Sequence, residues 1–337
     1  EVGLCSAMNY GYGYLFVGLP LSHLESDMAS YGKECRLFGV SSSIQVQFPI
    51  LQQSALNLMG TIRSSLSNAG QNTSLTMLSG KAMDQTQALT TVKGNAQRMT
   101  FRDICTFRLF LASVFRDHST AIEMIEKLSE FPLYSPLIGR MHTRAAFTGL
   151  ASFNILRKRT LVKKLSSRTK KKIETAASDA FEYFKNEVEK GSLNAYPILT
   201  LLIAEKTPEK SLYDEAMRVC GRSGLKNFQA IANESCAMLF LKEDEENPAS
   251  LTADDKDWAS YYLGRSVHLF NEWQAFAKSS QLQQSYPELL NTSSLLADER
   301  ATGTSFRGKA SHNDSVAAKT LTVVFDDDDV TGREDND

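Results

Sequence analysis

The sequence predicts an all-α fold, and three observations lead to this prediction. Only 8 of the 337 residues are proline, so few positions can interrupt a helix. Apolar residues recur mostly at spacings of three and four, which is the helical period. The period-two alternation that is typical of strands is almost absent. We therefore expect a chain of consecutive helices.

About twelve helices follow from this periodicity. Ile104, Phe107 and Leu111, for example, fall on one stripe of a single helix. Gly191 ends another helix, since glycine is the usual residue just past a helix C-terminus. The predicted helices are Glu1–Val17, Leu21–Phe38, Ile44–Met59, Gln97–Phe115, Ser119–Ser129, Leu137–Leu156, Thr169–Lys190, Tyr196–Glu205, Ser211–Val219, Lys226–Leu241, Asp254–Trp273 and Phe276–Ser285.

Two segments interrupt this series. Residues 60–95 are rich in Ser, Thr, Gly, Asn and Gln, and we interpret them as a polar loop or insertion with one weak helix. Phe131–Pro136 is a break bounded by prolines.

The short connections predict antiparallel helical hairpins. We expect the hairpins to stack as a TPR-like, right-handed superhelix, in which each hairpin contacts only its neighbours. Ala121 with Ile125, and Ala216 with Cys220, lie four residues apart, as in the second helix of a tetratricopeptide repeat. Small residues at such points let two helices approach closely.

The chain divides into residues 1–290, the helical repeat region, and residues 291–337, which we predict to be a disordered acidic tail. The second part holds few large apolar side chains and ends in the acidic runs Asp326–Asp329 and Arg333–Asp337. Such a segment buries too little surface to offset its ordering entropy. Leu321–Phe325 is an exception, and its β-prone run predicts either a lone strand or a docking peptide.

Composition narrows the class of protein. Hydrophobic residues make up 42% and charged residues 23%, close to a soluble globular average. A net charge of −2 disfavours a nucleic-acid binder that acts through its overall field. The five cysteines are scattered without a CxxC pair, which favours a reducing compartment and predicts a cytoplasmic protein. Glu1–Val17 is shorter than a membrane span and has no preceding basic region, so we expect neither a span nor a signal peptide.

The C-terminal third carries a resemblance to a known family. Ser211–Leu241 and Trp258–Leu290 contain Tyr261-Tyr262, Trp273 and Tyr286-Pro287 in a characteristic order. They resemble the TPR-like helical region of large signalling proteins of cyanobacteria and algae. In those proteins a kinase-like module and a predicted AAA- or STAND-type ATPase precede the helical region. GAF or PAS sensors follow it, often with a histidine kinase or cyclase.

The resemblance covers about residues 1–290 and implies a fragment of a larger ATPase or kinase protein, with neighbouring domains as partners. The loop at 60–95 and the tail after Leu290 depart from the family pattern. No P-loop, kinase signature or histidine-kinase box occurs in the sequence, so ATP binding and phosphotransfer carry over to no residue here.

We predict no catalytic residue, no cofactor-binding residue and no metal ligand. The histidines form no HExxH motif, and no GxSxG is present. We interpret Gly11-Tyr12-Gly13 as a helix kink and Gly221–Gly224 as a helix stop. The acidic run Glu243–Asp257 lacks the calcium-binding loop spacing and is interpreted as a solvated loop. The five histidines are His23, His118, His142, His268 and His312.

Arg157–Lys172 is the one marked charge cluster, with nine basic residues in sixteen. Three interpretations remain open. In the first, the run is a solvated helix end followed by a basic lead into the next helix. In the second, it docks an acidic surface such as Glu243–Asp257 or Asp326–Asp329. In the third, it binds nucleic acid, anionic lipid or an import receptor.

The function predicted from the sequence is that of a non-catalytic helical scaffold, which mediates protein–protein or interdomain contacts in a signal-transduction protein. A DNA-binding or transcriptional regulator that uses Arg157–Lys172 is the first alternative. An all-α enzyme is the second. It would need polar residues converging inside the apolar stripes, where we expect only isolated polar members.

Overall fold

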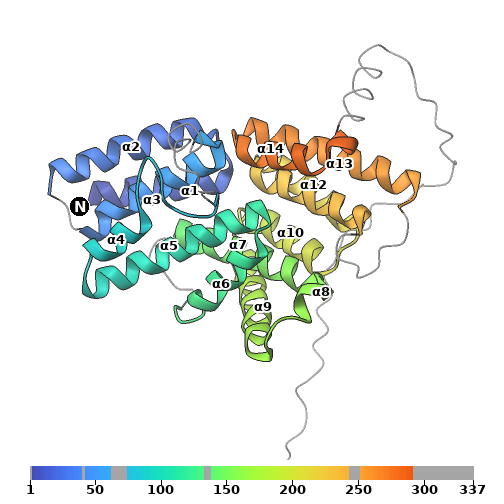
Figure 1. The fold of residues 1–337 in the computed structure, drawn as a ribbon, viewed down its shortest axis with the longest axis horizontal. Coiled ribbons are helices and arrows are strands. Elements are labelled where there is room, and N and C mark those ends of the chain that lie inside the picture. Colours follow the sequence, from blue (N-terminus) through green and yellow to red (C-terminus); the bar gives the residue numbers. More distant parts are fainter. Residues whose placement is uncertain (1, 40–41, 62–73, 133–137, 243–250, 291–337) are drawn as a thin grey trace, which may run out of the picture. The chain divides into compact units, whose positions relative to one another are not determined.

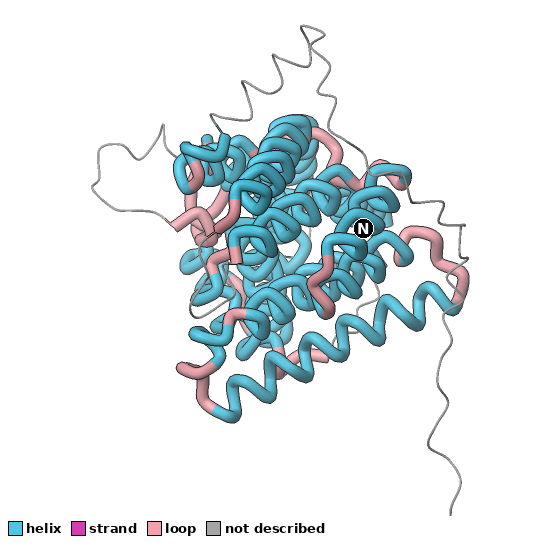
Figure 2. Tube along the Cα trace, turned by 90° about the vertical axis from the view of Figure 1, so that its right-hand side faces the viewer, coloured by secondary structure: helices cyan, strands magenta, loops and turns pink. Residues whose placement is uncertain are grey.

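The computed structural model describes residues 2–39, 42–61, 74–132, 138–242 and 251–290. Within these ranges the chain forms helices and no strand, and a single isolated bridge joins Ser79 and Asp84. The all-α prediction is confirmed for this part of the chain. Figure 1 shows the order of the helices, and Figure 2 shows them joined by short loops. The predicted tail, with Leu321–Phe325, and Glu243–Ser250 lie outside the described residues.

The helices agree closely with the periodicity of the sequence. Most begin and end within three residues of their predicted positions. They are α1 Val2–Val17, α2 Leu21–Leu37, α3 Ser42–Met59, α4 Gln85–Thr91, α5 Gly94–Phe115, α6 His118–Leu128, α7 Ile138–Arg157, α8 Arg159–Val162, α9 Ser167–Glu189, α10 Tyr196–Lys206, α11 Lys210–Arg222, α12 Lys226–Leu241, α13 Ala253–Glu272 and α14 Phe276–Ser285.

Local chemistry explains several helix ends. Thr252 and Asp255 form a capping box at the start of α13, and Asp254 adds negative charge at the positive end of that helix. The acidic residues 254 and 255 therefore begin a helix and do not belong to a loop. At the end of α5, Arg116 takes a left-handed conformation with φ of 55°, and Asp117 begins α6 directly afterwards.

The described part of the polar segment 60–95 is fixed against α3. The amide of Asn57 donates to the carbonyls of Leu75 and Met77 at 2.8 and 2.7 Å. The N–H of Ala82 donates to Gln53 at 2.9 Å. The one weak helix expected in this segment is α4.

Consecutive helices pair as hairpins, with α2 on α3, α11 on α12 and α12 on α13 among the most extensive pairings. The expectation that each hairpin contacts only its neighbours is wrong, however. α1 also packs on α7 and α12, and α14 packs on α3 and α5. We use the name closing contacts for the bonds that join the two ends of the described chain to distant helices, and they are made by Asn227, Leu21, Ser22, Glu234 and Gln281.

The closing contacts begin at the C-terminus of α1. The amide of Asn227 on α12, which is fully buried, donates to the carbonyls of Leu15 and Phe16 at 3.3 and 3.1 Å. Gly18 in the following turn has φ of +75°, and a Cβ there would lie 2.6 Å from Asn227 Oδ1. Only glycine satisfies both conditions at this position.

Two further bonds tie the start of α2 to the end of α13. The N–H of Leu21 donates to the carbonyl of Trp273 at 3.3 Å, and that of Ser22 to Gln274 Oε1 at 2.8 Å. These donors are among the first N–H groups of α2, which have no partner within their own helix. The hairpin of α13 and α14 therefore caps a helix more than 250 residues earlier in the sequence.

Candidate functional site: a groove between three helices

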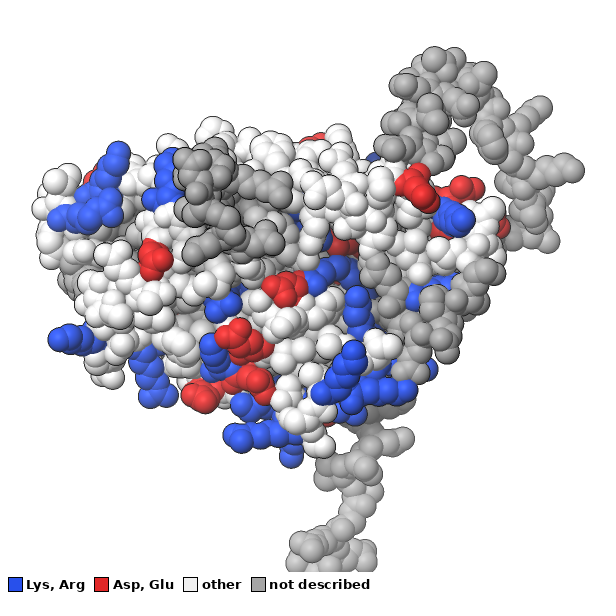
Figure 3. All heavy atoms as spheres, viewed as in Figure 1, with Lys and Arg blue, Asp and Glu red and all other residues white. Residues whose placement is uncertain are grey.

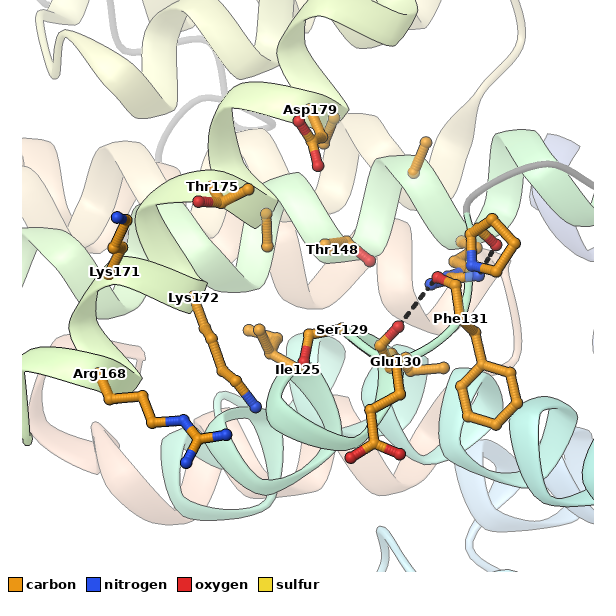
Figure 4. Close-up of a pocket in the computed structure, with 16 residues that line it drawn as sticks. Ile125, Ser129, Glu130, Phe131, Thr148, Arg168, Lys171, Lys172, Thr175 and Asp179 are labelled. Atoms are coloured by element: carbon orange, nitrogen blue, oxygen red, sulfur yellow. Dashed lines mark hydrogen bonds between the residues drawn. The ribbon is translucent and has the colours of Figure 1, made fainter.

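A groove of about 570 Å³ lies between the C-terminal part of α6, the middle of α7 and the first half of α9. Its size falls in the range of ligand pockets, roughly 300–1,000 Å³. Figure 4 shows its lining side chains, with α9 along one side and the end of α6 along the other. Apolar lining residues come from all three helices and include Ile125, Leu128, Ala145, Ala176 and Ala180.

Hydrogen bonds fix both ends of α6, which forms one wall of the groove. At its start, Asp117 accepts the N–H of Thr120 at 3.0 Å and the hydroxyl of Thr76 at 3.1 Å. Burial acts to raise the pKa of Asp117, but these hydrogen bonds outweigh it and leave the pKa below its ordinary value. Along the helix, Met124 and Ile125 pack into a small core shared by α5, α6, α7 and α9.

Arg144 on α7 holds the other end of α6. Its guanidinium donates to the carbonyls of Leu128, Phe131 and Pro132 at 2.9, 2.8 and 2.7 Å. Leu128 is the last residue of α6, and Phe131 and Pro132 lie in the segment that follows it, so Arg144 fixes this segment against α7. Burial, with the nearby charge of Arg102, lowers the pKa of Arg144 to about 10. Arg144 thus shapes the groove wall, and its guanidinium N–H groups are directed at backbone carbonyls of this chain.

A basic rim borders the groove on the α9 side. It consists of Arg168, Lys171 and Lys172, and the first two are exposed. Lys172 Nζ reaches across to the carbonyl of Glu126 on α6 at 3.4 Å. Figure 4 shows the Arg168 and Lys172 side chains extending toward α6, and Figure 3 shows Lys and Arg gathered in the region of α8 and α9.

The cations of the rim lie near the N-terminus of α9, where positive charge does not stabilise a helix. Ser166 caps α9 by accepting the N–H of Thr169 at 3.1 Å, so Arg168 lies in the first turn. The macrodipole makes this end positive and favours anions there. In the part of the chain that the structure describes, no carboxylate lies within ion-pair distance of Arg168 or Lys171.

The predicted basic cluster Arg157–Lys172 therefore separates into two environments. Arg157, at the end of α7, is mostly buried and pairs with Glu205 at 2.8 Å and with the hydroxyl of Tyr213. Burial, aided by the charge of Glu205, raises the pKa of Tyr213. The interpretation of the whole run as a solvated helix end is wrong for Arg157. It fits Arg168 and Lys171, which are exposed.

Sequence reasoning missed the buried polar clusters. Arg140 pairs with Asp103 at 3.2 Å and donates to Gln47 at 3.0 Å, and Tyr12 also donates to Gln47 at 3.0 Å. The expectation of only isolated polar members inside the apolar stripes is wrong here. Each of these side chains lies beside an apolar stripe, and nothing in the spacing of one helix indicates a partner on another.

A second buried cluster belongs to the closing contacts. Glu234 on α12 accepts from Arg116 at 2.9 Å and from Lys278 on α14 at 2.7 Å, and Glu234 and Lys278 side chains are only 3% and 1% exposed. Gln281 donates to the carbonyl of Phe115 at 3.0 Å beside it. Within each cluster the opposite charges pair with one another. None of the residues of either cluster lines the groove.

Two of the described histidines, His142 and His268, contact nearby side chains of the chain. His142 is buried among aromatic rings, and its Nδ1 lies 3.0 Å from the hydroxyl of Tyr183. His268 is exposed and lies 3.1 Å from Glu272. His312 lies outside the described residues. Among the described residues, no group of three His, Cys, Asp or Glu side chains is placed to hold a metal ion.

The glycine pairs have different roles. Gly11 lies inside α1, where a Cβ would approach Met28 and Leu51 to about 3 Å, so it permits close packing of α1 on α2 and α3. Gly224 follows the end of α11 with φ of +74°, as expected of a helix stop.

Comparisons of the chain with family models, with curated proteins and with solved structures found no match. The resemblance of Ser211–Leu241 and Trp258–Leu290 to signalling proteins therefore stays a prediction. Of the helices that the structure describes, none has the length and apolar character needed to cross a membrane.

Proposed function

We propose that this chain is a non-catalytic helical scaffold that binds a protein segment in the groove between α6, α7 and α9. The observation that carries the proposal is the groove itself, with an apolar floor contributed by three helices and charged groups at its edge. Protein surfaces of this kind bind peptide segments through burial of apolar anchors, with polar groups at the rim.

The placement of the ionisable side chains supports a non-catalytic role. Asp103 with Arg140, and Glu234 with Lys278, meet in the interior, where these side chains are 8% exposed or less. General acid–base chemistry requires such groups within reach of a substrate. In the groove Arg168, Lys171 and Lys172 lie along the rim, and Arg144 is bonded to backbone carbonyls in the wall.

The signalling setting rests on the resemblance alone, and the compartment rests on the scattered cysteines. On these grounds we propose a cytoplasmic scaffold in a signal-transduction protein, beside ATPase, sensor or kinase modules of the same polypeptide. The tetratricopeptide-like spacing at Ala121 and Ile125 is in α6, which forms one wall of the groove.

A peptide-library selection against the full chain tests the proposal. Selected peptides should slow amide hydrogen exchange in α6, α7 and α9. Thr175→Trp should abolish this binding, because Thr175 is exposed and lines the groove, so the indole fills it. Ser178→Trp is the matched control, since Ser178 is exposed on the same helix and does not line the groove.

Two results would contradict the proposal. One is a selection that yields only peptides whose binding is unaffected by Thr175→Trp. The other is protection confined to helices away from the groove. A circular dichroism melt of each variant establishes that the fold is retained.

A further inference from the structure

We infer that the groove selects a peptide in which a large apolar side chain lies close in the sequence to several carboxylates. This inference rests on the proposed function and names the chemistry of its partner. The apolar part matches the apolar lining, in which Phe131 and Ala176 are partly exposed and Ile125 and Leu128 are buried beneath the surface. The acidic part is dictated by the rim on α9.

The rim favours negative charge for two independent reasons. Arg168, Lys171 and Lys172 bring three cations to one edge of the groove. The same edge is the N-terminal part of α9, a helix of 23 residues, and its macrodipole also attracts anions. A carboxylate bound there interacts with both, whereas an added cation is repelled by both.

The cations of the rim do not stabilise α9, because they lie near its positive end. This argues that they serve another purpose. Lys170, on the same helix, has a carboxylate partner, Glu174, at 3.7 Å. For Arg168 and Lys171 no such partner occurs among the residues that the structure describes. Their charge is therefore available to a ligand at the groove edge.

The remaining charges orient the peptide. Asp179 lies about two turns beyond Lys172 on α9, and Glu130 lies just after the end of α6. Figure 4 shows Asp179 well separated from Arg168, with Thr148 between the two walls. The carboxylates of the peptide thus belong at the Arg168 end, away from Asp179, and its apolar residue belongs over the floor.

Fluorescence anisotropy with labelled synthetic peptides and the full chain tests the inference. The probe is a short peptide with Leu and Phe followed by four Asp. One comparison peptide replaces the four Asp by Lys, and another replaces Leu and Phe by Ala. We expect each change to weaken binding at least about tenfold. Added salt should weaken binding of the Asp peptide without abolishing it, because salt screens only the rim.

Substitutions on the chain locate the charge effect. Arg168→Gln with Lys171→Gln should weaken the Asp peptide at least about fivefold and leave the Lys peptide unaffected or improved. The matched control is Arg159→Gln with Lys164→Gln, which removes one Arg and one Lys from the same basic run at exposed positions outside the groove. It should change the affinity less than twofold.

The outcomes separate the two proposals. Peptides that require an open groove but bind equally well with Asp or Lys overturn this inference and leave the proposed function standing. No groove-dependent peptide binding at all overturns both. Tight, steeply salt-dependent binding of labelled duplex DNA that is lost in the Arg168 and Lys171 variant, with no binding of the Asp peptide, overturns both in favour of the DNA-binding alternative.

Discussion

The closing contacts and the groove both use cations, but in opposite surroundings. In the closing contacts Lys278 is buried, Arg116 is mostly buried, and both share the carboxylate of Glu234. At the groove Arg168 and Lys171 are exposed on the first turns of α9. The difference shows that the position of a charged residue relative to the core decides its contribution. A buried charge must be matched for the fold to form, whereas an exposed charge adds little to stability.

The largest expected effect comes from breaking the match in the closing contacts. Glu234→Gln removes the buried carboxylate that Arg116 and Lys278 share, and we expect the free energy of unfolding to fall by about 3–5 kcal/mol. Urea denaturation measures it. Glu215→Gln, which removes an exposed ion pair with Arg218, is the control and should leave the midpoint unchanged. Equal stability of Glu234→Gln and wild type would show that the cluster is not a determinant of the fold.

A smaller effect is expected from the neutral part of the closing contacts. Asn227→Ala removes the donor to the carbonyls of Leu15 and Phe16, and should lower the free energy of unfolding by about 1–3 kcal/mol. Hydrogen exchange should then speed up at the end of α1 more than in α6. Uniform acceleration throughout the chain would argue that Asn227 acts on global stability and not on this junction.

On the groove side, Asp117→Ala removes the N-cap of α6 and should cost about 1 kcal/mol. Folding lowers the pKa of Asp117. Its contribution is therefore fully present above its unfolded-state pKa, about pH 4, and is lost as the pH falls through the lower folded-state pKa. The stability difference between wild type and variant should shrink over that acidic range. A difference that stays constant down to pH 2 would contradict this assignment.

The smallest effect on stability is expected at the rim. Arg168→Gln with Lys171→Gln should change the free energy of unfolding by less than about 0.5 kcal/mol, with a slight increase favoured because a cation leaves the positive end of α9. A thermal melt at low salt gives the sign. A loss of several degrees in Tm would show that these cations contribute to the fold, and the comparison with Arg116 and Lys278 would no longer hold.

The two regions also differ in how far the sequence predicts them. The groove walls could be anticipated, because α6 follows the cap at Asp117 and α9 follows that at Ser166, and both helices have clear apolar periodicity. The closing contacts could not. Asn227 and Leu15 are 212 residues apart, and a single amide in an apolar helix gives no indication of such a partner.

The sequence alone determined the secondary structure of this protein. Apolar spacing, caps and glycines act over a few residues, so they specify where helices begin and end whatever surrounds them. The tertiary structure decided which charges became buried. Arg157 and Arg168 belong to one basic run, yet one pairs with Glu205 in the interior while the other borders a groove. That separation depends on how α7, α9 and α10 pack, which is a long-range property that no local pattern encodes.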